Sequence, residues 1–153
     1  MATKTIRQTV IFKATPHQVY EALMDSRKHG SFTGGGARIS RKVGGRFSVF
    51  GGWAAGTNLA LVPDRRIVQA WWCQNRGWPA DHSSRATFAL RKIRGGTRLT
   101  LTHSGVPIPA YADIKQGWWE NYWTPMKAML ASSLRAAGST GQSGRRRRSA
   151  PSG

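Results

Sequence analysis

The sequence is poor in cysteine, in acidic residues and in long apolar segments. Its 153 residues include one cysteine, Cys73, which excludes an intramolecular disulfide and a cysteine-based metal cluster. No run of about 18 apolar residues is present, so we expect no transmembrane helix. Residues 1–6 lack the apolar stretch of a signal peptide. These absences favour a reducing, cytoplasmic compartment, and the length suits one domain with its own core.

Acidic residues are few and basic residues are many. Six Asp and Glu stand against 24 Lys and Arg, which gives a formal net charge of +18. Such a balance raises the question of a polyanionic partner. Four of the positive charges, Arg145–Arg148, lie in a closing segment, and most of the others are scattered over expected strand edges and turns. We expect a solvated basic surface and disfavour nucleic-acid binding, because the aromatic residues are not interleaved with Lys and Arg as stacking platforms would be.

The expected elements begin with a strand over 3–13, which is rich in β-branched residues. Thr15-Pro16 then starts a short helix, and Asp25-Ser26 starts a second one that runs to about Phe32. From Ala37 onward, turn signals separate short strand patterns. The strands expected there cover 37–40, 43–50, 53–62, 66–74, 83–92 and 97–103.

A final helix is expected over about 112–136, after a loop that holds Pro107 and Pro109. Its middle carries four aromatic residues within six positions, which is too much apolar surface for a solvated helix. Pro125 lacks an N–H group for the helix ladder, so we expect a kink near it. From residue 137 the chain has almost no apolar content, and we expect the tail 137–153 to be disordered.

Alternation of apolar and polar residues assigns the faces of the strands. The expected inward residues of the last two strands are Ala86, Phe88, Leu90, Leu99, Leu101 and His103. The strand over 66–74 is apolar on both faces, so it is either central or has one face against a partner. On the final helix, helical spacing predicts one stripe of Trp119, Trp123, Met126 and Leu130, beside a second stripe of Trp118, Tyr122 and Met129.

Six short motifs stand in order along the chain. They are Phe32-Thr33-Gly34-Gly35, Val43-Gly44-Gly45-x-Phe47-Ser48, Phe50-Gly51-Gly52, Asn58-Leu59-x-Leu61-Val62-Pro63, Arg66-Ile67-Val68-Gln69-Ala70-Trp71 and Gly117-Trp118-x-x-x-Tyr122-Trp123-x-Pro125-x-Lys127. Together they resemble the C-terminal-like domain of the activator of Hsp90 ATPase homologue family, which lies within the START-like (SRPBCC) superfamily. Each motif alone has low specificity, but six in this order over residues 5–131 specify the fold strongly.

The resemblance implies an α+β helix-grip (START-like) fold over residues 1–136. In that fold a curved antiparallel sheet of about six to seven strands wraps round a long C-terminal helix, with two short helices after the first strand. The resemblance also implies a cavity in the grip and a link to an Hsp90-type chaperone. Full-length co-chaperones of the family carry a separate N-terminal domain that makes the main contact with the Hsp90 middle segment.

An aromatic helix held by a curved sheet predicts a cavity for a flat or greasy ligand. The candidate lining residues are Trp71, Phe88, Leu101, His103, Trp119, Tyr122 and Trp123. His103 either binds a ligand or exchanges protons there, or it is a hydrogen-bonded histidine at the end of the sheet. The tryptophans either line the cavity or pack the core. Trp78, beside Pro79, is expected at the cavity mouth or at a partner surface.

No constellation of residues predicts catalysis, a metal or a cofactor. His17, His29 and His82 have no metal-ligand spacing, and no paired carboxylates or nucleophile motif accompany them. Cys73 is expected to be a buried structural thiol. The sequence therefore predicts a non-enzymatic protein. It either modulates an Hsp90-type ATPase or a stress response through a protein surface, or carries or senses a small hydrophobic ligand.

Overall fold

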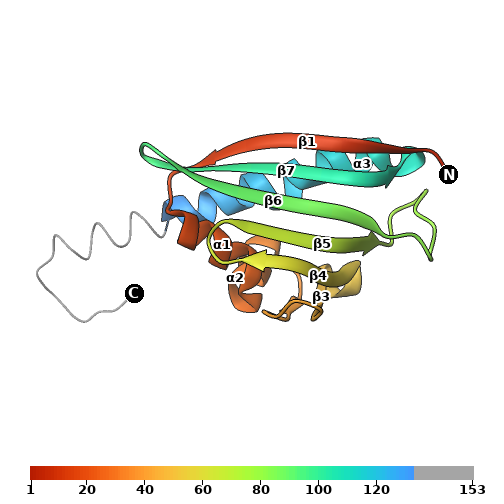
Figure 1. Ribbon diagram of the computed structural model, residues 1–153, viewed down its shortest axis with the longest axis horizontal. Helices are drawn as coiled ribbons and strands as arrows, with labels where there is room; N and C mark the ends of the chain where they lie inside the picture. Colours follow the sequence, from red (N-terminus) through yellow and green to blue (C-terminus); the bar gives the residue numbers. More distant parts are fainter. Residues whose placement is uncertain (133–153) are drawn as a thin grey trace, which may run out of the picture.

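The computed structural model describes residues 1–132, in which seven strands form one antiparallel sheet with all helices on the same side of it (Figure 1). The strands lie in the order β1-β7-β6-β5-β4-β3-β2. Their bounds are Thr3–Phe12 for β1, Arg38–Ile39 for β2, Arg46–Val49 for β3, Ala54–Val62 for β4, Arg66–Cys73 for β5, Ser84–Ile93 for β6 and Gly96–Pro107 for β7. The α+β helix-grip prediction is confirmed. The expected tail 137–153, with Arg145–Arg148, lies outside the described residues.

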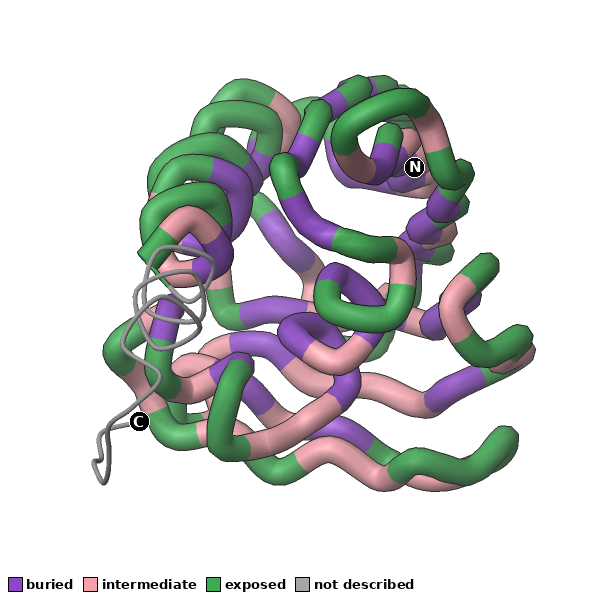
Figure 2. Tube along the Cα trace, turned by 90° about the vertical axis from the view of Figure 1, so that its left-hand side faces the viewer, coloured by how far each residue is buried: buried purple, intermediate pink, exposed green. Residues whose placement is uncertain are grey.

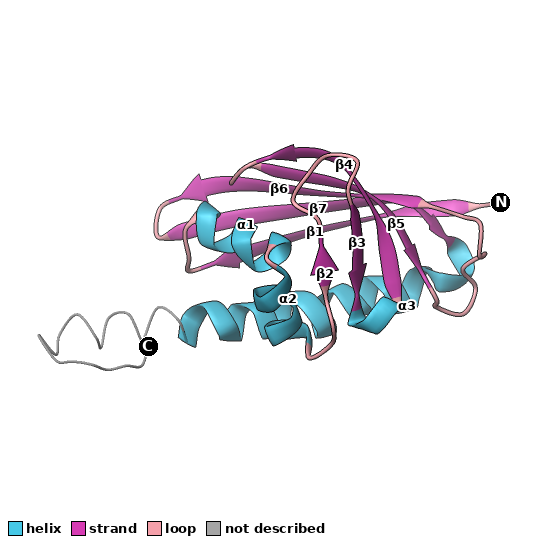
Figure 3. Cartoon of the chain, turned by 90° about the horizontal axis from the view of Figure 1, so that it is seen from below, coloured by secondary structure: helices cyan, strands magenta, loops and turns pink. Residues whose placement is uncertain are grey.

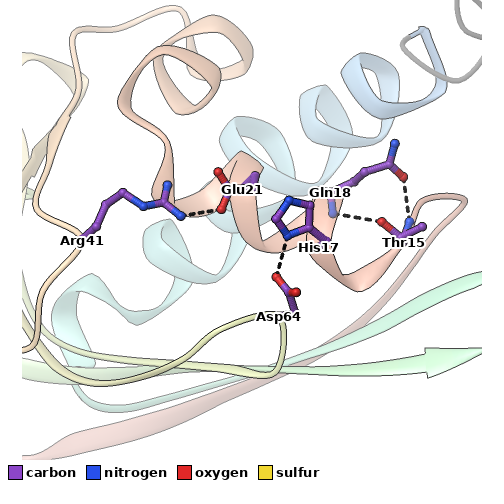
Figure 4. Close-up of polar contacts among 6 residues, drawn as sticks. All are labelled: Thr15, His17, Gln18, Glu21, Arg41 and Asp64. Carbon is purple, nitrogen blue, oxygen red and sulfur yellow. Dashed lines mark hydrogen bonds and ion pairs between the residues drawn. The ribbon is translucent and has the colours of Figure 1, made fainter.

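The two short helices begin where the sequence predicts. Helix α1 spans Pro16–Met24, and its first turn is closed by a capping box. The Thr15 hydroxyl accepts from the Gln18 backbone N–H at 3.1 Å, and the Gln18 side chain accepts from the Thr15 N–H at 2.8 Å (Figure 4). Helix α2 spans Ser26–Thr33 and is capped by the Asp25 carboxylate, which accepts from the Lys28 N–H at 2.9 Å.

One hydrogen-bonded pair and one ion pair hold α1 against neighbouring loops (Figure 4). The His17 Nδ1 lies 2.9 Å from the Asp64 carboxylate, in the turn between β4 and β5. Arg41, in the loop between β2 and β3, pairs with Glu21. Both pairs are partly exposed to water, so they position the helix more than they stabilise the fold.

A long helix (residues 108–132) runs across the inner face of the sheet (Figure 3). It consists of α3 (Ile108–Trp118), a π-helical turn η2 (Trp119–Trp123) and a further α-helical stretch over residues 124–132. The predicted loop before it is wrong, because β7 continues to Pro107 and the helix begins at once. Pro109 lies in its first turn, where a missing N–H group costs little.

The predicted faces of the strands are confirmed. Buried positions alternate with more exposed ones along β1, β6 and β7, and the inward residues predicted on β6 and β7 are all buried (Figure 2). Strand β5 is fourth of seven, so its apolar pattern marks a central strand. Gly51 and Gly52 form, with Phe50, a 3₁₀ turn at positive φ between β3 and β4, as the predicted bend requires.

Candidate functional site

The π-helical turn in the long helix decides which aromatic side chains face the sheet. A turn of this kind holds one more residue than an α-helical turn, so residues five apart share a face. Trp118 and Trp123 are therefore both buried, with their rings stacked at 5.6 Å and 14° between planes. The prediction that Trp119 shares a stripe with Trp123 is wrong: Trp119 is 40% exposed, and Trp118 takes the inward position.

Gln8, on β1, stabilises this turn from the sheet. Its side-chain amide donates to the Lys115 carbonyl at 2.9 Å, and its oxygen accepts from the Trp123 Nε1–H at 2.7 Å. The Trp119 N–H donates to the Gln116 carbonyl, which leaves the Lys115 carbonyl for the glutamine. These bonds fix the rotation of the helix on which the inward aromatic residues depend.

The other candidate cavity residues mostly fill the grip. Leu101, His103 and Trp123 have no exposed surface, and Phe88 packs edge-on against both Trp118 and Trp123. The space that remains in the centre of the grip, between Phe88, Tyr122 and His29, has a volume of about 10 Å³. That is room for about one water molecule.

His103 is the centre of a buried hydrogen-bond chain. The Trp118 Nε1–H donates to its Nδ1 at 3.1 Å, so the ring proton of the neutral histidine is on Nε2. That Nε2–H donates to the Ser84 hydroxyl at 2.8 Å, and the hydroxyl donates to the Trp71 carbonyl at 2.9 Å. Burial lowers the pKa of His103 to about 3, which keeps the ring neutral. Of the two roles that the sequence left open for His103, this geometry matches that of a hydrogen-bonded structural histidine.

His29 forms a second buried pair that sequence reasoning missed. Its Nε2 is hydrogen-bonded to the Tyr122 hydroxyl at 2.9 Å, while its Nδ1 is buried without a partner among the described residues. Burial lowers the pKa of His29 to about 4 and raises the pKa of Tyr122. The two residues are 93 positions apart, so the sequence predicted that His29 lies in a helix but not that it contacts Tyr122.

A groove opens at the side of the grip, with a volume of about 330 Å³. It lies between residues 113–122 of the long helix and the sheet-side residues Phe50, Trp53, Trp71 and Asn75. Of the predicted cavity residues, Trp71 and Tyr122 line this groove. Trp78 was predicted at the cavity mouth or at a partner surface, and this prediction is wrong. The residue is buried and packs edge-on against Trp71 at 5.5 Å.

The remaining reactive groups have structural surroundings. Cys73 is free and buried, and burial raises the pKa of its thiol to about 11, which disfavours the reactive thiolate. Within residues 1–132, no three His, Cys, Asp or Glu side chains gather as potential metal ligands. None of the helices described has the length and apolarity needed to cross a membrane.

Comparison with known proteins identifies the relatives of this fold. The sequence profile described as "Activator of Hsp90 ATPase homolog 1-like protein" matches residues 13–131. An activator of 90 kDa heat shock protein ATPase homolog from Dictyostelium discoideum is 29% identical over 121 residues, which are 78% of this chain and 31% of that protein. The human homolog 1 is 28% identical over 123 residues, which are 80% of this chain and 35% of that protein.

The solved structures agree in fold. The crystal structure of an HSP90 activator from Plasmodium falciparum superposes with a TM-score of 0.77 at 24% identity, and covers 83% of this chain and 96% of that chain. The chain spans about a third of the length of the curated relatives it matches.

Proposed function

Since the chain belongs to the activator of Hsp90 ATPase homolog 1-like family, we propose that it is a non-enzymatic binding domain linked to an Hsp90-type chaperone, in a cytoplasmic stress response. The family match over residues 13–131 is the observation that carries this proposal. The relatives it matches are about three times longer, so the domain corresponds to one part of them.

The outer face of the sheet supports a role in binding a protein partner. None of the seven strands contains an acidic residue, and several of them carry exposed arginines. Arg7, Arg66, Arg85, Arg91 and Arg98 are all exposed on strands β1, β5, β6 and β7. A surface with one sign of charge speeds association with a partner of the opposite sign, and suits an acidic protein surface.

The buried polar residues support the non-enzymatic part of the proposal. A general base must reach a substrate proton and hold a pKa near the working pH. Both ring nitrogens of His103 instead form hydrogen bonds inside the core. The pKa values of His103 and His29 are also far below neutral pH.

The decisive experiment is ATP turnover by Hsp90 from the same organism, titrated with the full chain at low and near-physiological salt. We expect a rise that persists at near-physiological salt. The double variant Arg85→Ala/Arg91→Ala should weaken the rise, while Lys28→Ala/Lys127→Ala, which removes two exposed charges from the helical side, should not. A flat response, or a rise at low salt alone, would overturn the chaperone link.

A second candidate function is the binding of a small hydrophobic ligand, and the groove is the observation that favours it. The centre of the grip leaves about 10 Å³, too little for a ligand, whereas the groove offers about 330 Å³ beside Trp53, Trp71 and Trp118. That volume is at the lower end of the range of ligand sites. Tryptophan fluorescence of the chain, titrated with small aromatic compounds, tests this function, and Trp53→Ala should weaken any binding seen.

A further inference from the structure

The walls of the groove are aromatic. Phe50 and Trp53 reach it from the segment between β3 and β4, Trp71 from β5, and Trp118 and Tyr122 from the long helix. Trp53 stands edge-on to Trp71 at 6.3 Å, and Trp71 lies 5.7 Å from Trp118. Trp71, Trp118 and Tyr122 are nearly fully buried, so the accessible ring surface at the opening comes mainly from Phe50 and Trp53, which are half-buried. An accessible aromatic face attracts a cation.

The helical side of the same groove carries two carboxylates, Asp113 and Glu120. The described residues that line the groove include no Lys, Arg or His, although the chain holds 24 Lys and Arg and only six acidic residues. Two of the six acidic residues therefore lie at one opening that no described basic residue lines, on a chain with a large excess of positive charge.

These two carboxylates differ from the acidic residues that serve the fold. Glu21 and Asp64 each face a basic side chain (Figure 4), and Asp25 caps a helix. Asp113 and Glu120 have neutral partners instead. The Asn75 amide donates to Asp113 Oδ2 at 3.0 Å, and the Gln116 amide donates to Glu120 Oε2 at 2.8 Å. In the part of the chain that the structure describes, neither carboxylate lies within ion-pairing distance of a base.

We propose that the groove binds a small organic cation, an amine or quaternary ammonium attached to a flat or aliphatic body. The apolar body packs against the aromatic walls, and the charged nitrogen lies between the ring faces and the two carboxylates. The proposal rests on the second candidate function, and it names the chemical class of ligand. The neutral amides orient the carboxylates without neutralising them, so their charge is available to the ligand.

The first test is a titration of the full chain with three probes of similar size, followed by tryptophan fluorescence. The probes are 2-phenylethylammonium, neutral 2-phenylethanol and anionic 3-phenylpropionate, which share a phenylethyl body. We expect the cation to bind about tenfold more tightly than the neutral probe, through the two carboxylates and the ring faces together, and the anion to bind least. The preference should shrink at high salt, because the carboxylates are exposed.

The matched variants separate charge from shape. Asp113→Asn/Glu120→Gln keeps the side-chain lengths, and should remove most of the cation preference while leaving the affinity for 2-phenylethanol within about twofold. Asp81→Asn, which removes an exposed acidic residue outside the groove lining, should change neither affinity. Thermal melting of each variant checks that the fold is kept.

The outcomes separate the proposed cation binding from the binding of a small hydrophobic ligand, on which it rests. Equal affinity for cation and neutral probe overturns the cation and leaves a hydrophobic ligand site. A preference that survives Asp113→Asn/Glu120→Gln in full overturns the role of the two carboxylates. No binding of any probe overturns both. A preference lost in the double variant and kept in Asp81→Asn supports both.

Discussion

His103 and His29 are both buried against the aromatic residues of the long helix, yet they differ in how their ring nitrogens are used. Burial lowers the pKa of both, to about 3 and about 4. His103 has a hydrogen-bond partner for each nitrogen, whereas the Nδ1 of His29 has none among the described residues. The pKa thus reports burial alone, while the cost of replacing each histidine depends on the bonds that it makes.

This difference separates two kinds of buried polar residue. The His103 chain joins β5, β6, β7 and the long helix, so its loss leaves other polar groups unpaired. His29 joins α2 to the long helix through one bond, beside a void of about 10 Å³. The following four predictions test the comparison, from the largest expected effect to the smallest.

Acidification should destabilise the fold through both histidines. Each folded pKa lies below the ordinary value of 6.5, so the unfolded chain binds more protons between pH 6.5 and pH 4. The stability present above pH 6.5 is lost as the pH falls, by about 2 kcal/mol for each histidine at pH 5. Urea unfolding at pH 7.5, 6 and 5 measures this loss. A free energy of unfolding that stays level over this range would show that neither histidine is held neutral.

His103→Leu should lower the free energy of unfolding by about 2–3 kcal/mol. The substitution leaves the Trp118 Nε1–H buried without an acceptor, which carries most of the cost. Adding Trp118→Phe should then cost less than it does in the parent chain, because its donor has already lost its partner. A double-mutant cycle by urea unfolding checks this coupling, and strict additivity would contradict the hydrogen bond.

Ser84→Ala should convert His103 into a residue like His29, with one nitrogen unpaired. The expected loss is about 1–2 kcal/mol, because the Nε2–H of His103 then has no acceptor. Ser104→Ala, on the neighbouring strand β7, is the control, since Ser104 makes no such bond to His103. Urea unfolding measures both, and equal losses would mean that the Ser84 hydroxyl does not serve the histidine.

His29→Phe should be the mildest change, within about 1 kcal/mol of the parent chain. The ring keeps its aromatic contacts with Phe32 and Tyr122, and the substitution removes the unpaired nitrogen together with one hydrogen bond. In the double variant His29→Phe/Tyr122→Phe no hydroxyl is left unpaired, so part of any loss should return. A loss above about 2 kcal/mol in His29→Phe would show that its hydrogen bond matters more than the geometry implies.

The strands were predictable because apolar and polar residues alternate along them with a period of two. Leu99 and Leu101 alternate with polar neighbours, and both face inward as predicted. The start of the long helix was not predictable, since β7 passes into it at Pro107 without the loop that two prolines suggested. A kink was predicted near Pro125; the structure has a π-helical turn over Trp119–Trp123 just before it, which the sequence did not predict.

The candidate site was predicted in part, for a physical reason. An α-helical period places Trp119 with Trp123, and the π-helical turn shifts that period by one residue, which brings Trp118 inward instead. The groove joins Phe50 and Trp71 to residues 113–122, segments far apart in the chain. Contacts of that kind depend on tertiary structure, and no local pattern announces them.

The pairing of β1 with β7 sets an order of events during synthesis of the chain. Thr3 lies opposite Pro107 and Phe12 opposite Thr97, so β1, the first strand to be synthesised, cannot pair until β7, the last strand, has been made. The long helix that covers the inner face is made later still. Closing so long a loop costs entropy before its contacts repay it. The domain therefore gains its core in one late step, and a nascent chain that ends before about residue 108 presents bare strands to the chaperones and proteases around it.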